Sequence, residues 1–293
     1  MNEILEKIDK ASHIVIISDV NPDAGSIGSA SAMYSFLLQK HKKVSWFCKT
    51  EVVNYRFSFI AWVEKIRDSF PASADLAISL GCGDKKNLGI EPMCDLINIE
   101  RHFLYDFFKA NEVKINKKMA TALYAELLYD SDAFLSDEVD GTTFALAKEL
   151  IECGADFKLC NKYIMKSVSL AALRLKAVMF KNMLLECDAR VAVFCLSDED
   201  MRLTGAVTED CEAVLAESLN LIHVEVSLLL KQNSDFTIKG FLRSNSEVDC
   251  VKIAANFDGE GHKKRADFDV DSLEQIDDIK NRVLNLIKKE III

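Results

Sequence analysis

The sequence predicts an α/β protein of two domains, and three observations support this prediction. Apolar segments of strand length alternate with segments of helical spacing, first within residues 1–156 and again within residues 186–293. The chain has 293 residues, which is enough for two ordinary domains. Hydrophobic residues make up 49% of it, so each domain can bury a core. Such alternation is typical of a parallel sheet that helices cover on both faces.

The N-terminal domain, residues 1–156, contains four segments with the composition of strands and three with the spacing of helices. The charged residues at the very start also favour a helix. The third helical segment has Thr142 near its start and Gly154 in a position suited to end it. The expected strands are 13–18, 43–48, 75–80 and 95–99, and the expected helices are 27–40, 117–129 and the segment that begins at 141.

The second half begins with a segment that has no strand pattern. Residues 157–185 are rich in Lys, Leu and Met with helical spacing, and we predict a helical connector there. The strand and helix pattern then restarts, so residues 186–293 are predicted to form a smaller α/β domain with a Gly-containing turn before its last helix. Its expected strands are 189–196, 223–230 and 236–244, and its expected helices are 208–219, 248–257 and 272–289.

Composition excludes several classes of protein. The formal net charge of −10 argues against a broad basic face for duplex DNA. Apolar runs such as 14–17 are too short to span a bilayer, and the first ten residues lack the apolar stretch of a signal peptide. Nine scattered cysteines without a C-x-x-C spacing indicate a reducing compartment and no structural zinc. We therefore expect a soluble cytoplasmic protein.

Polar residues follow the predicted strands at the point where each strand ends. Asp19 and Asp23 follow the first strand, Asp84 follows the third and residues 100–102 follow the fourth, while Asp130 follows the helix 117–129. Each cluster alone is also explained as a turn, a helix cap or a solvated ion pair. Ligands of open parallel sheets bind beyond the carboxyl ends of the strands, so the shared position of these clusters favours one site.

Five motifs in one order resemble the DHH family of phosphoesterases, in the subgroup with an associated C-terminal domain. The similarity is greatest to the nano-RNase and 3′-phosphoadenosine-5′-phosphate (PAP) phosphatase type. It extends over nearly the whole chain. The motifs are "DVNPDAGSIGS" (19–29), "ISLGCGDKKNLGI" (78–90), "INIERHF" (97–103), "LYAELLYDSDAF" (123–134) and, near the C-terminus, "FLRSNSEVDCVKIAANF" with "FDGEGHKKRADF" (241–268).

The resemblance implies a site in a cleft between the two domains. In the family two Mn²⁺ ions lie at the strand ends, and a metal-bound hydroxide attacks the phosphorus. Carried over by position, the matching residues fall into three groups. These are the metal ligands Asp19, Asp23 and Asp130, the phosphate-facing His102, and the substrate-binding residues Arg243, Ser244, Gly261 and His262.

Six positions of this chain depart from the family pattern. The His of the first motif is Asp19, which can still serve as a ligand, and two glycines of the C-terminal turn are Asp258 and Glu260.

The other three departures remove metal ligands. The second Asp of the first motif is Gly25, the Asp that bridges the metals is Gly81, and a metal-binding His is Arg101. Glycine offers no side-chain ligand, and a guanidinium stays protonated and repels a cation. We therefore expect at most one weak Mn²⁺ site. Arg101 and His102 are predicted at the catalytic position, where they would hold a phosphate by charge-assisted hydrogen bonds.

Three functions remain open from the sequence. The favoured one is a phosphoesterase-like protein that binds short single-stranded oligonucleotides or phosphorylated nucleotides, with impaired or lost two-metal hydrolysis. The second is an active Mn²⁺-dependent oligoribonuclease or nucleotide 3′-phosphatase that uses shifted ligands such as Asp84 and Asp132. The third is a scaffold protein without a nucleotide ligand. Neither duplex DNA nor a membrane is expected as a partner, and a homodimer is left open.

Overall fold

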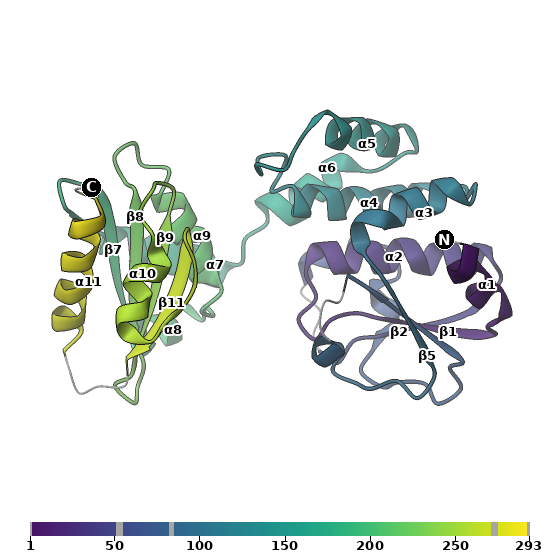
Figure 1. Ribbon diagram of the computed structural model, residues 1–293, viewed down its shortest axis with the longest axis horizontal. Coiled ribbons are helices and arrows are strands. Elements are labelled where there is room, and N and C mark those ends of the chain that lie inside the picture. Colours follow the sequence, from purple (N-terminus) through teal and green to yellow (C-terminus); the bar gives the residue numbers. More distant parts are fainter. Residues whose placement is uncertain (1, 51–54, 82–84, 271–274, 292–293) are drawn as a thin grey trace. The chain divides into compact units, whose positions relative to one another are not determined.

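The computed structural model describes residues 2–50, 55–81, 85–270 and 275–291 (Figure 1). The chain divides into two compact units, Met1–Ser167 and Val168–Ile293. The segment expected as a connector is divided between them, because helix α6 (Phe157–Cys160) and a π-helix, η5 (Asn161–Lys166), belong to the first unit, whereas α7 (Leu170–Lys181) belongs to the second. Among the described residues, no helix is long and apolar enough to cross a membrane.

The first unit contains a parallel five-stranded sheet of order β3-β2-β1-β4-β5. The two central strands, β1 and β4, are buried along their whole length, as expected where helices cover a parallel sheet. The four predicted strands are confirmed, and the two-residue β3 is an addition. Their bounds are β1 His13–Ile17, β2 Lys43–Phe47, β3 Ile66–Arg67, β4 Leu76–Leu80 and β5 Asp95–Ile99.

Three long helices of the first unit, α2, α4 and α5, begin at side chains that cap them. Asp23 accepts a hydrogen bond from the backbone of Ser26 at the start of α2, Asn116 caps α4, and Asp140 forms a capping box at α5. The predicted helices are confirmed, whereas α3 was not predicted. The bounds are α1 Asn2–Lys10, α2 Ala24–Gln39, α3 Leu104–Ala110, α4 Lys117–Asp130 and α5 Gly141–Glu152, with 3₁₀ turns η1 Tyr55–Phe57, η2 Val63–Lys65, η3 Lys85–Leu88 and η4 Arg101–Phe103.

Helix α2 is the central helix of the first unit. It lies between the sheet and α4 (Figure 1), and each of its residues from Ala24 to Leu37 is buried. Small residues let it approach α4 closely: a Cβ at Gly28 would lie 2.5 Å from the carbonyl oxygen of Ala122. This packing fixes the first turn of α2 and the last turn of α4 relative to one another.

The second unit is built on a six-stranded mixed sheet of order β10-β11-β9-β8-β7-β6. Strands β7 and β8 pair parallel, and the other neighbours pair antiparallel. Helices α10 and α11 cover one face, and α7, α8 and α9 cover the other. The bounds are β6 Leu184–Glu186, β7 Val191–Ser197, α8 Asp198–Thr204, α9 Asp210–Ser218, β8 Val226–Gln232, β9 Ile238–Ser244, α10 Cys250–Ala254, η6 Ala255–Phe257, β10 Glu260–His262, β11 Arg265–Val270 and α11 Ile276–Ile291.

The main difference from the sequence prediction lies just before the last helix. A Gly-containing turn was expected there, but residues 260–270 form the hairpin of β10 and β11. Ala266 and Phe268 alternate into the core, while Asp267 and Asp269 point away from it. The charged residues on the outer face and the short strand length concealed this alternation in the sequence.

Candidate functional site

The candidate site lies at one edge of the first sheet, where the carboxyl ends of β1, β4 and β5 meet. The chain runs outward from β1 to β2 and β3 and then returns to β4 on the other side of β1. Such a switch of direction leaves a crevice in which ligands of open α/β sheets bind. Asp19 follows β1, Gly81 follows β4 and Arg101 follows β5. The backbone N–H of Gly81 donates to the carbonyl of Ile99 at 2.8 Å, which holds the last two strand ends together.

Arg101 joins two of the predicted carboxylates. Its Nη1 donates to Oδ1 of Asp23 at 3.0 Å, and its Nη2 lies 3.8 Å from Oδ1 of Asp130. Asp23 caps the first turn of α2, and Asp130 ends α4. Burial works against the charged form of Arg101, but Asp130 and Asp23 outweigh it and raise the pKa of the guanidinium above its usual value. The cation therefore links the two helix ends.

The side chain of Arg101 also fills the space above two glycines. A Cβ at Gly25 would clash with Nη1 of Arg101 and lie 2.7 Å from Oδ1 of Asp130. A Cβ at Gly81 would lie 2.6 Å from Cγ of Arg101, and the φ of +69° at Gly81 disfavours any other residue. These are two of the positions at which the resemblance places metal ligands. One arginine thus occupies the volume that two carboxylates would need.

A buried acid of this site was missed from the sequence. Glu126 lies one helical turn before Asp130 on α4, is only 7% exposed, and its Oε2 has no hydrogen-bond partner among the described residues. Burial raises the pKa of Glu126 to about 8, so the side chain is mainly neutral at pH 7. Burial likewise raises the pKa of Asp130, although Arg101 opposes this. An acid between apolar residues in "YAELLY" was the available signal.

These side chains line a cavity of about 170 Å³ between η4, α4 and α5. Arg101, His102, Glu126 and Asp130 supply its polar part. His102 is exposed, and its ring lies 3.9 Å from that of Phe103. The remaining lining is one aromatic and four aliphatic side chains, Tyr105, Leu123, Leu127, Leu146 and Leu150. The cavity therefore offers charged groups beside an apolar wall.

The donors that the structure describes at this edge do not fit a pair of divalent cations. Mn²⁺ takes carboxylate, imidazole and water ligands, yet the described residues contain no group of three or more His, Cys, Asp or Glu that could hold a metal ion. Asp23 and Asp130 both face Arg101 instead. Asp19 lies half-buried at the same edge, and the structure gives its side chain no hydrogen bond or ion pair with a described residue.

The shifted ligands considered from the sequence gain no support from this geometry. Asp84 lies outside the described residues. Asp132 is exposed, in a left-handed turn after α4 with φ of +46°. The structure gives it no ion pair with Arg101.

The substrate-binding residues expected in the second unit lie on neighbouring strands. Arg243 on β9 is directly opposite Arg265 on β11, and Arg265 is opposite His262 on β10, so the three side chains share one face of the sheet. Arg243 is only 7% exposed. Its guanidinium bonds Glu212 at 3.0 and 2.5 Å and Asp267 at 2.6 Å. An anion reaches it only by displacing one of these carboxylates.

The other two expected residues of that unit have backbone or local roles in the structure. Ser244 is buried, and its hydroxyl accepts a hydrogen bond from the backbone N–H of Ser246 at 3.1 Å. Gly261 has φ of +143°, and a Cβ there would lie 2.6 Å from Cα of Ala266. Close strand approach thus explains the glycine without a ligand.

Comparison with known proteins identifies relatives that match over nearly all of this sequence, although no protein-family model matches the chain. The probable bifunctional oligoribonuclease and PAP phosphatase NrnA of Streptococcus mutans is 22% identical, over 97% of this chain and 98% of that protein. The bifunctional oligoribonuclease and PAP phosphatase NrnA of Mycoplasma genitalium is also 22% identical, over 95% of each chain.

A solved structure supports the fold. An exopolyphosphatase-related protein from Bacteroides fragilis superposes with a TM-score of 0.80 at 20% identity, covering 98% of this chain and 95% of that one. At this identity the likeness concerns the fold alone. Over nearly its whole length, then, the chain is similar to the NrnA-type proteins, which confirms the resemblance to the DHH phosphoesterases that its motifs indicated.

Proposed function

We propose that the chain binds phosphorylated nucleotides or the ends of short oligonucleotides at the strand-end site, without two-metal hydrolysis at an ordinary enzymatic rate. Two relatives are named as oligoribonucleases and PAP phosphatases, which supports this class of ligand. The observation that carries the loss of hydrolysis is the guanidinium of Arg101. It lies between Asp23 and Asp130 and fills the space above Gly25 and Gly81.

Arg101 has donors left for a phosphate. A guanidinium carries five N–H donors, and only the one to Asp23 is used in a hydrogen bond among the described residues. His102 lines the same cavity. An arginine that pairs with phosphate oxygens forms strong, often bidentate, charge-assisted bonds. The site is thereby suited to hold a phosphate, whereas its described residues include no cluster that would hold a metal ion to activate a water molecule.

The acids beside Arg101 repel a bound phosphate when they are ionised, so their protonation state sets the strength of this repulsion. Burial keeps Glu126 neutral below about pH 8 and raises the pKa of Asp130. Both shifts reduce the negative charge that a phosphate meets. Affinity for PAP should therefore rise as the pH falls from 8 to 6, in contrast to a site whose carboxylates stay ionised.

Calorimetry with PAP in the presence of EDTA tests the binding. Wild type should bind without metal, and Arg101→Gln should bind at least roughly tenfold more weakly, because one charged hydrogen bond contributes about 1.5–3 kcal/mol. Arg67→Gln is the matched control, since Arg67 is an exposed arginine of the same unit that bonds backbone carbonyls. Equal loss in both variants, or no binding and no thermal shift with any phosphorylated nucleotide, would favour a scaffold instead.

An activity assay tests the loss of hydrolysis. With Mn²⁺ and a five-nucleotide oligoribonucleotide, wild type should stay far below the usual range of about 1–10³ s⁻¹. The double variant Gly25→Asp with Arg101→His restores two ligand types and removes the blocking guanidinium, so it should bind Mn²⁺ more tightly than wild type. Turnover by wild type within the usual range would defeat the proposal in favour of an active enzyme.

A further inference from the structure

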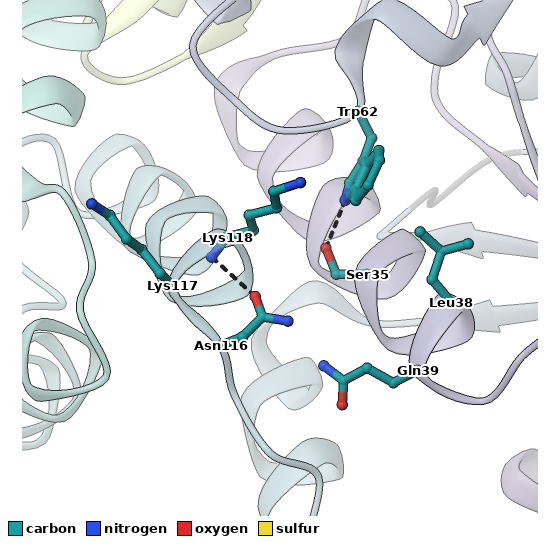
Figure 2. A pocket seen from close by; sticks show the side chains of 7 residues that line it. All are labelled: Ser35, Leu38, Gln39, Trp62, Asn116, Lys117 and Lys118. Carbon is teal, nitrogen blue, oxygen red and sulfur yellow. Dashed lines mark hydrogen bonds between the residues drawn. The ribbon is translucent and has the colours of Figure 1, made fainter.

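A groove at the far end of α4 from the candidate site is formed by two adjoining hollows. One, of about 470 Å³, lies between the C-terminal part of α2 and the start of α4 (Figure 2). The other, of about 670 Å³, continues past Phe59 toward α6. Trp62, Lys117 and Lys118 line both hollows. Because α4 has 14 residues, this groove begins about 20 Å from Asp130 along the helix.

Trp62 is held in a fixed position in this groove. Its indole Nε1–H donates to the hydroxyl of Ser35 at 2.8 Å, as Figure 2 shows, and one ring face stacks on Tyr34 with centroids 5.4 Å apart. Its backbone has φ of +71°, a conformation that a bulky residue rarely adopts. Strain of this kind persists where the surroundings over-determine the position, and it is found most often at ligand sites.

Lys118 of the groove lies over an aromatic ring, and so does Lys162, which is on η5 and outside the lining of both hollows. Lys118 Nζ is 4.0 Å from the centre of the Trp62 ring, and Lys162 Nζ is 5.2 Å from that of Tyr163. Tyr163 in turn stacks on Phe59 at 5.3 Å. Across the described residues, no ion pair includes Lys117, Lys118 or Lys162, in a chain of net charge −10.

The groove therefore has a stacked aromatic pair with an ammonium above it at Trp62, and Phe59 connects it to a second such pair, in which Lys162 lies over Tyr163. Glu64 and Asp156 also line the second hollow; Asp156 is used as the cap of α6 through the N–H of Leu159. Alternating ring faces and cations are the features that bind single-stranded nucleic acid without sequence preference, because every base has a face to stack and every linkage a phosphate. A base that stacks on Trp62 frees the ammonium of Lys118 for the neighbouring phosphate.

We propose that this groove, lined by Trp62, Lys117, Lys118 and Phe59, is a second nucleic-acid site that binds single-stranded oligonucleotide. It is independent of the strand-end site and does not require the proposed function. It would hold a strand by stacking and charge, with no chemistry on it.

Tryptophan fluorescence reports directly on oligonucleotide binding in the groove. The chain has two tryptophans; Trp46 is 1% exposed in the core, so a ligand in the groove alters the emission of Trp62. The probe is a six-nucleotide phosphorothioate thymidylate in EDTA, which resists hydrolysis. Wild type should bind it with a change in tryptophan emission. Lys117→Gln with Lys118→Gln should weaken binding at least tenfold and lower the slope of log affinity against log salt by roughly 1.4, since two phosphate contacts are lost.

A matched control removes two exposed lysines elsewhere, Lys288→Gln with Lys289→Gln on α11, and should leave affinity unchanged. The affinity measured from Trp62 emission should also be unchanged in Arg101→Gln, which separates this groove from the strand-end site. The inference is overturned if the Lys117 and Lys118 variant gives the wild-type emission titration, if Arg101→Gln alone abolishes the emission change, or if a hexaglutamate peptide binds as tightly as the probe.

Discussion

Two arginines of this chain are each held by a pair of carboxylates, one in each unit, yet their surroundings differ. The Arg243 side chain is 8% exposed and donates to Glu212, to Asp267 and to the carbonyls of Leu242 and Ala266. The Arg101 side chain is 25% exposed, makes one hydrogen bond among the described residues, and lines a cavity.

The difference separates a structural arginine from one able to receive a ligand. The donors of Arg243 are satisfied within its own unit, so its removal should cost stability. Arg101 retains unused donors beside a cavity, so its removal should cost binding. Residue type alone does not distinguish the two, whereas the number of internal hydrogen bonds does.

The largest expected effect concerns Glu126, the buried carboxyl at the strand-end site of the first unit. Its Oε2 has no hydrogen-bond partner among the described residues. The pKa of Glu126 is about 8 in the folded chain against 4.5 normally. A raised carboxyl pKa means that folding takes up a proton, so stability is full below about pH 4.5, falls with rising pH, and levels off above about pH 8. The slope reaches about 1.4 kcal/mol per pH unit. Arg101, Asp23 and Asp130 face this carboxyl and modulate it.

Glu126→Gln should remove this pH dependence and stabilise the first unit at pH 8. Urea unfolding followed by tryptophan fluorescence measures it, since both tryptophans, Trp46 and Trp62, lie in the first unit. An equally steep dependence in the variant would contradict the assignment to Glu126.

The next effect concerns the structural arginine. Arg243→Met leaves Asp267 without its cation and leaves Glu212 with Arg265 alone. It should destabilise the second unit by about 3 kcal/mol, at the low end for buried pairs because Glu212 and Asp267 are about one-third exposed. The loss should appear in unfolding followed by circular dichroism and not in the tryptophan signal. If the second unit were as stable in Arg243→Met as in wild type, the distinction between a structural Arg243 and a ligand-binding Arg101 would be wrong.

A pair of glycines in α2 gives the third test. Gly28→Ala places a methyl group against the backbone carbonyl of Ala122, which cannot move alone, so it should cost about 2 kcal/mol. Gly25→Ala meets mainly the flexible end of Arg101, and the gain in helix propensity of about 1 kcal/mol offsets that contact. Its stability should stay near wild type while PAP affinity falls. Equal losses of stability in both variants would show that the Arg101 side chain yields to a new methyl group no more readily than the backbone carbonyl of Ala122 does.

The smallest expected effect is the stability change on losing Arg101 itself. Arg101→Gln should change the free energy of unfolding of the first unit by less than about 1 kcal/mol, because the pair is partly exposed. Tryptophan-detected unfolding measures this. A loss comparable to that of Arg243→Met would place both arginines in one structural class.

Much of the fold follows from sequence periodicity. The buried strands "HIVII" and "LAISL" and the capped helices α2 and α4 were predicted because continuous apolar runs and cap residues are local signals. Strands β10 and β11 were missed because Asp267 and Asp269 interrupt the apolar pattern.

Part of the candidate site was also predicted from the sequence. Asp23, Arg101 and Asp130 come together as the strand-end argument requires, because topology brings them to one edge. Arg243 bonds Glu212 and Asp267, which lie 31 and 24 residues away in the sequence. No local sequence pattern reveals such long-range pairs. The burial of Glu126 depends in the same way on the close packing of α2 against α4.

The backbone at Gly81 constrains how this edge of the sheet can change over time. A carboxylate there would need a residue to tolerate φ of +69° while the aliphatic stem of Arg101 stands 2.6 Å from its Cβ. A mutation at position 81 is therefore unfavourable until position 101 has become smaller. Geometry therefore sets the order of the substitutions. A lineage that acquires metal ligands at this edge must replace Arg101 by a smaller residue before it replaces Gly81.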